Sequence, residues 1–161
     1  MSFKEDLEIS EVYENEILAT LQKSFPHAKK VEESEQDFFD LVIPKFKKQK
    51  EIRMEVKVDL YPSKNLAFEY LGPGAKSTGV LRTKANIWIH FRTERYLLWK
   101  MEKLKRYLLN CGCGYTRMVG DKHATTAWII PEEKIFQECP PDLVMVRGGE
   151  EINNFLLNLN K

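Results

Sequence analysis

Two carboxylates and a lysine on neighbouring β-like segments are the residues of this chain best suited to chemistry. Glu55 and Lys57 lie two positions apart in a run, 52–59, where apolar and polar residues alternate. Side chains two positions apart point to the same face of a β-strand, so Glu55 and Lys57 would emerge side by side. Asp40 directly precedes the apolar segment 41–43, and a hairpin between the two segments would bring it to the same place.

An acidic pair beside an ammonium group suits a divalent cation and an anionic substrate. Mg²⁺ prefers oxygen ligands and commonly binds one or two carboxylates, which leaves positions for water and for substrate phosphate. A nearby lysine can orient the attacking water and offset the phosphate charge. The pattern therefore predicts metal-dependent hydrolysis of a phosphodiester. The alternative interpretation is a half-exposed strand with surface ion pairs, because Glu-x-Lys is a common pattern.

The segments before this run are expected to form a helix and a hairpin. Apolar residues recur at helical spacing from residue 11 to about Phe25, where Pro26 would end the helix. Glu14 would border the buried face of this helix. The expected segments that follow are a short strand at 28–31, a strand at 38–43, a basic turn at 45–50 and a returning strand at 52–60.

The rest of the chain mixes strands and helices. An alternating strand at 65–71 precedes a Gly-rich loop, and a short helical turn then leads into a buried strand within 81–91. The further expected elements are a strand at 95–99, a helix at 101–109 ended by Gly112 and Gly114, a strand at 124–130, a helix starting at Pro131 and a short helix at 151–159. This order predicts one α/β domain over residues 1–161, with a central mixed β-sheet flanked by helices.

Over about residues 10 to 136 the chain resembles the PD-(D/E)XK nuclease superfamily, close to its small phage and Holliday-junction-resolvase-like members. The matching residues are Glu14 in the first helix, Asp40 at the hairpin start, the run Glu55-Val56-Lys57 and the strand that contains Glu69. The run from Ser77 to Trp88 is similar to the Ser-Gly-Ile, Thr-x-Ala-Asp, aromatic pattern of that family. Two positions depart from it, since Phe39 replaces a proline and Asn86 stands where an acid is frequent.

The resemblance implies a restriction-endonuclease-like fold and a Mg²⁺- or Mn²⁺-dependent endo- or exonuclease that acts on DNA ends or branched junctions. It implies that Asp40, Glu55 and the Val56 carbonyl would bind the cation. Lys57 would position the nucleophilic water, and Glu14 would help to hold a second ion or a metal-bound water. The alternative function is a catalytically inactive nucleic-acid-binding or protein-interaction module with the same fold.

Contacts with DNA are expected from local clusters, because the net charge of +1 does not by itself draw the protein to nucleic acid. The residues expected to bind substrate are Lys76, Ser77, Arg82, Thr83 and Lys84, just after the catalytic strands. The lysines of the hairpin turn, Lys45, Lys47, Lys48 and Lys50, fit a solvated turn better. One small domain presents one active site, so cutting both strands would require a homodimer or two successive nicks.

The cysteines supply a competing chemistry. Cys111, Cys113, His123 and Cys139 could provide four zinc ligands, although Cys-x-Cys lacks the usual zinc-knuckle spacing. An odd number of cysteines argues against a disulfide framework. With no signal peptide or long apolar span, we expect no membrane partner and a reducing cytoplasmic setting, in a bacterial, archaeal or phage- or virus-infected cell.

Overall fold

The computed structural model describes residues 3–32, 38–45, 50–61, 63–110, 116–119 and 125–159. The helices are α1 (Phe3–Gln22), the 3₁₀ helix η1 (Pro73–Ala75), α2 (Gly79–Arg82), α3 (Met101–Asn110), α4 (Glu132–Glu138) and α5 (Glu151–Leu159). The strands are β1 (Lys29–Lys30), β2 (Leu41–Ile43), β3 (Ile52–Val58), β4 (Asn65–Leu71), β5 (Ile87–Arg92), β6 (Arg95–Lys100), β7 (Thr116–Val119), β8 (Thr125–Pro131) and β9 (Leu143–Val146).

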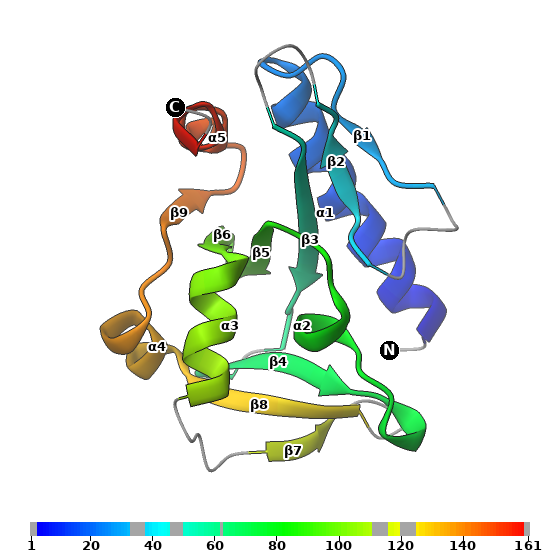
Figure 1. Ribbon diagram of the computed structural model, residues 1–161, viewed down its shortest axis with the longest axis vertical. Helices are drawn as coiled ribbons and strands as arrows, with labels where there is room; N and C mark the ends of the chain where they lie inside the picture. Colours follow the sequence, from blue (N-terminus) through cyan, green and yellow to red (C-terminus); the bar gives the residue numbers. More distant parts are fainter. Residues whose placement is uncertain are drawn as a thin grey trace.

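The strands form two sheets. The larger sheet has the order β1-β2-β3-β5-β6-β9, and the smaller has the order β4-β8-β7. Strands β3 and β5 run parallel, whereas the other neighbouring strands pair antiparallel. In Figure 1 the smaller sheet lies across the lower end of the molecule, away from β1 and α5. The predicted α/β fold with a mixed sheet flanked by helices is confirmed.

Hydrophobic residues cover both faces of the larger sheet. On one face, α1 contributes Tyr13, Ile17 and Leu21, whose spacing of four puts them on one side of the helix, and α5 packs beside them. On the other face, helices α2, α3 and α4 and the smaller sheet enclose a second cluster around Trp88 and Trp99. Because both faces are covered, every residue of β5 is buried, as is usual for a strand with a parallel neighbour.

The alternation along β3 decides where its polar side chains go. Met54 and Val56 belong to the cluster under α1. Glu55 and Lys57 therefore point to the opposite face, toward α2 and the smaller sheet. The fold thus places the predicted catalytic residues between the two sheets.

Some predicted boundaries differ from the structure. Helix α1 ends at Gln22 rather than near Phe25, because a residue that precedes proline disfavours the helical conformation. Strand β2 begins at Leu41 rather than at Phe38, and strands β7 and β9 were not predicted. The middle of the basic turn, with Lys47 and Lys48, lies outside the described residues, as do Gly112 and Gly114.

Among the described helices, none combines the length and the apolar character that crossing a membrane requires.

Candidate active site

The chain bends at Asp40, and this bend aims its carboxylate at β3. Leu41 is in register with Met54, yet the N–H of Asp40 also donates to the carbonyl oxygen of Met54, at 2.9 Å. Two residues of one segment therefore oppose one residue of the other, which is the arrangement of a β-bulge and re-aims a side chain. As a result, Asp40 Oδ2 accepts a hydrogen bond of 2.6 Å from the N–H of Val56.

Glu55 is held by a buried hydroxyl. Thr83 Oγ1 lies 3.0 Å from Glu55 Oε2 and 2.6 Å from the carbonyl oxygen of Phe38, and it accepts the N–H of Ala85 at 3.1 Å. The hydroxyl has one proton and faces two acceptors, the Phe38 carbonyl oxygen and the Glu55 carboxylate. Its hydrogen bond to Glu55 favours the ionised carboxylate and lowers the pKa of Glu55, against the larger effect of burial.

The environment of both acids favours their neutral forms. Burial, followed by the charge of Glu55, raises the pKa of Asp40 to about 8. Burial likewise raises the pKa of Glu55 above its ordinary value. The negative charge of Glu14 raises both pKa values and the positive charge of Lys57 lowers them. Glu14, Asp40 and the pair Glu55 and Lys57 come from three separate segments of the chain, and the charges of Glu14 and Lys57 act on both Asp40 and Glu55.

Lys57 is held by a third acid. Its Nζ lies 2.8 Å from Glu69 Oε1 on β4, and its charge also lowers the pKa values of Asp40 and Glu55. Glu14 forms a comparable pair with Lys30 on β1, at 3.2 Å. Neither lysine removes the negative character of the site, because Glu14 still raises the pKa values of Asp40 and Glu55, and Glu69 raises that of Glu55.

Gly79 brings the loop after β4 close to this site. Its φ is +45°, and a Cβ atom built there would lie 2.4 Å from the carbonyl oxygen of Glu69. A side chain at this position would therefore push α2 away from β4. Since Thr83 directly follows α2, this close approach also sets the position of the hydroxyl beside Glu55.

The donor set fits one Mg²⁺ or Mn²⁺ ion. Asp40 and Glu55 offer two carboxylates that repel each other without a cation. The N–H of Val56 donates to Asp40. Val56 lies beyond the part of β3 that pairs with β2, so its carbonyl stays a predicted ligand. Two carboxylates leave most of an octahedron to water and substrate. Within the described residues, no three His, Cys, Asp or Glu side chains are grouped closely enough to hold a metal ion by themselves, so Glu14 stays a predicted ligand.

The five residues expected to bind substrate fall into two groups. Lys76, Ser77, Arg82 and Lys84 are exposed, on or beside the loop that leads into β5. Thr83 is only 5% exposed, and its hydroxyl is committed to contacts inside the protein. Its nearness to Glu55 suits a residue that positions a carboxylate, a role that a buried threonine in a sequence does not reveal.

The alternative zinc site falls mostly outside the described residues, which include neither Cys111, Cys113 nor His123. Cys139 is buried in the cluster around Trp99, and burial raises the pKa of its thiol. Its carbonyl oxygen accepts the Trp99 Nε1–H at 2.8 Å, so the residue has a clear packing role.

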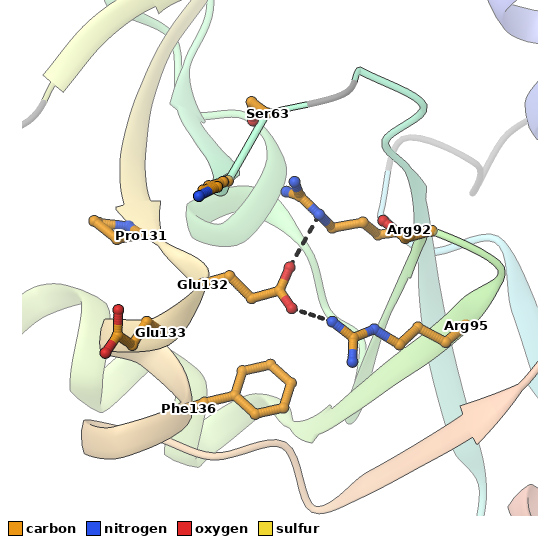
Figure 2. A pocket seen from close by; sticks show the side chains of 9 residues that line it. Ser63, Arg92, Arg95, Pro131, Glu132, Glu133 and Phe136 are labelled. Carbon is orange, nitrogen blue, oxygen red and sulfur yellow. Dashed lines mark hydrogen bonds and ion pairs between the residues drawn. The ribbon is translucent and has the colours of Figure 1, made fainter.

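A second cluster of charged residues joins the two sheets. Figure 2 shows Glu132, at the start of α4, pointing between Arg92 and Arg95 beside a pocket of about 650 Å³. Glu132 Oε2 lies 3.1 Å from Arg92 Nε, and Oε1 pairs with Arg95 Nη2. Arg92 is 4% exposed and also faces Asp59, at 3.6 Å. Because both guanidinium groups are engaged by Glu132, this cluster serves to hold the sheets together.

Comparison of the chain with protein-family models, with curated proteins and with solved structures gives no match. The function therefore has to be argued from the geometry of the site.

Proposed function

We propose that this protein is a metal-dependent nuclease that hydrolyses phosphodiester bonds in DNA. The observation that carries the proposal is the pair of half-buried acids, Asp40 and Glu55, which repel each other beside the Lys57–Glu69 ion pair and whose pKa values are both raised. Burying two repelling carboxylates costs stability, so their presence is best explained by a cation that they bind. A structural ion pair would need one acid for one base, whereas Lys57 faces three acids.

Each residue of the site has a role in this proposal. Asp40, Glu55 and the Val56 carbonyl would hold Mg²⁺ or Mn²⁺, which would offset the negative charge of the phosphate group undergoing attack. Lys57 would hold the attacking water, with Glu69 keeping its ammonium group beside Glu55. Thr83 would keep Glu55 in place through the contact at 3.0 Å.

The raised pKa values make cation binding depend on pH. At neutral pH Asp40 carries a proton for much of the time, because its pKa is about 8. A cation must displace that proton, so its affinity should rise as the pH increases toward about 8. A homodimer, which would supply two active sites for double-strand cutting, and a cytoplasmic setting remain predictions.

The test is cleavage of supercoiled, linear and four-way-junction DNA with Mg²⁺, Mn²⁺ or EDTA. The wild type should cut at least one substrate in either metal and none in EDTA. Lys57→Ala should reduce the rate by about 10²–10⁴-fold, the range for loss of a group that moves or holds a proton. Lys134→Ala, at a half-exposed lysine of α4 that faces Glu138, is the matched control and should cut like the wild type.

Melting curves of both variants show whether a lost activity reflects unfolding. If the folded wild type cuts no DNA in either metal, and calorimetry detects no divalent-ion binding, the nuclease proposal is wrong. The inactive nucleic-acid-binding or protein-interaction module would then explain the fold better.

A further inference from the structure

A second cavity, of about 550 Å³, lies beside the candidate active site. Its wall includes Lys29 of β1, Arg53 of β3 and Lys84 after α2, together with Phe38, Phe39 and Glu51. Figure 1 shows β1, β2 and β3 side by side, with α2 near the end of β3. Two of the segments that form the cavity, 38–44 and β3, also carry Asp40 and Glu55.

The cavity carries an excess of positive charge. Three of its side chains are cationic and one is acidic. Glu51 lies 3.6 Å from Arg53 Nε, beyond hydrogen-bond distance, and this buried nitrogen has no hydrogen-bond partner in the described part of the chain. Within the described residues, neither Lys29 nor Lys84 pairs with a carboxylate. The cavity is thus suited to an anion.

The aromatic rings hold these cations in place without neutralising them. Lys84 Nζ lies 3.8 Å from the centre of the Phe38 ring, and Arg53 Cζ lies 5.7 Å from the centre of the Phe39 ring. Cation–π contacts of this kind orient a charge but leave it available to a ligand. Since cations already cover these rings, the rings do not serve as stacking platforms for a base. The chemistry therefore points to a phosphate group.

Backbone contacts connect the cavity rigidly to the active site. Arg53 and Glu55 lie on the same face of β3, two residues and about 7 Å apart. The N–H of Lys84 donates to the Phe38 carbonyl, at 3.0 Å, next to the Thr83 hydroxyl that contacts Glu55. Arg53 is fixed as well, because its N–H donates to Asn86 Oδ1 at 2.9 Å.

We propose that this cavity, the flanking-phosphate pocket, binds a DNA phosphate group through Lys29, Arg53 and Lys84. This phosphate lies next to the phosphodiester that is cleaved, on the same strand. The choice of DNA as the ligand rests on the proposed nuclease function, whereas the phosphate chemistry rests on the cavity itself. The phosphate is either an internal phosphodiester or a terminal monophosphate of the strand.

The experiment measures DNA binding without cleavage. Fluorescence anisotropy in EDTA would follow the binding of labelled single-stranded and duplex oligonucleotides, each with a 5′-phosphate or a 5′-hydroxyl, to the full chain. The variants are Arg53→Gln, Lys84→Gln and the double variant, with Lys84→Arg as the charge-preserving control and Lys134→Gln as the remote control. Lys84 is exposed, so its substitution tests the pocket even if Arg53→Gln fails to fold.

The double variant should bind DNA about tenfold or more weakly at low salt. The slope of the logarithm of the binding constant against the logarithm of the salt concentration should fall by the equivalent of about one to two phosphate contacts. Lys84→Arg and Lys134→Gln should bind like the wild type. If a terminal phosphate is the ligand, the wild type prefers the 5′-phosphorylated DNA and the double variant loses this preference. If an internal phosphate is the ligand, the variants weaken both DNAs equally.

The proposal is overturned if folded Lys84→Gln and the double variant keep the wild-type affinity and salt dependence, or if the wild type binds none of these DNAs in EDTA. Cleavage assays in Mg²⁺ separate this result from the nuclease proposal. If the wild type cuts DNA and the variants bind as well as the wild type, the pocket proposal is wrong and the nuclease proposal stands. If the wild type does not cut DNA but the variants bind it more weakly, the pocket proposal stands and the nuclease proposal is wrong.

Discussion

Replacing Asp40 by asparagine should stabilise the protein at about pH 8.5 in the absence of divalent cations. Asparagine keeps the size of the side chain and an oxygen that accepts the Val56 N–H, but it carries no charge. In the wild type the pKa of Asp40 is raised from 3.8 to about 8, first by burial and then by Glu55. Between these two values the folded state holds a proton that the unfolded chain has lost. The free energy of unfolding therefore falls as the pH rises through this window.

The size of the effect follows from the width of that window. Each pH unit in it is worth up to about 1.4 kcal/mol, so the step from about pH 5.5 to about pH 8.5 is worth at most about 3.5 kcal/mol. Side chains relax and water enters around a buried charge, which gives an effective dielectric constant nearer to about 20 than to about 4. We therefore expect the free energy of unfolding to fall by about 2 kcal/mol more in the wild type than in Asp40→Asn between these two pH values.

The assay is urea unfolding in EDTA at both pH values, followed by the fluorescence of buried Trp88 and Trp99. Taking the difference between variant and wild type cancels the titrating groups that do not interact with Asp40. One of them is His90, whose pKa is lowered by burial and which acts in the opposite direction below about pH 6.5. Adding Mg²⁺ at a hundredfold excess over its Kd at the higher pH should stabilise the wild type by about 2.7 kcal/mol and the variant much less. Equal pH dependence in the two proteins would refute the reasoning.

Three further substitutions test the neighbours of the site. Thr83→Val should cost about 1–3 kcal/mol of stability, because it leaves the buried N–H of Ala85 without its acceptor. It should also weaken Mg²⁺ binding about 10–100-fold, because Glu55 loses its contact with the hydroxyl; calorimetry measures the affinity, and Thr83→Ser is the control. Glu69→Gln should lower the cleavage rate by about tenfold with little change in melting temperature, because Lys57 loses the charge that positions it; an unchanged rate would rule out this role. Glu132→Gln should cost about 3 kcal/mol in urea unfolding, because it breaks the pairs with two arginines, and should leave the cleavage rate of the folded protein unchanged.

Local patterns in the sequence predicted the elements that carry the site. The alternation along β3 puts Glu55 and Lys57 on one face whatever the strand packs against, because successive side chains point to opposite faces. The spacing of Tyr13, Ile17 and Leu21 likewise specifies one apolar side of a helix. Such periodicities belong to the backbone geometry itself, so they are readable without knowledge of the fold.

The convergence of distant segments was decided by the tertiary structure. The bend at Asp40, the Thr83 hydroxyl beside Glu55 and the pairing of Lys57 with Glu69 each join residues from separate elements. Packing of these segments also half-buries Asp40 and Glu55, and burial is the largest cause of their raised pKa values. Distances between remote segments and exclusion of water depend on how complete elements pack. No periodicity within a single segment contains that information. For the same reason, Lys84 was predicted to bind substrate, but its grouping with Lys29 and Arg53 in one pocket was not.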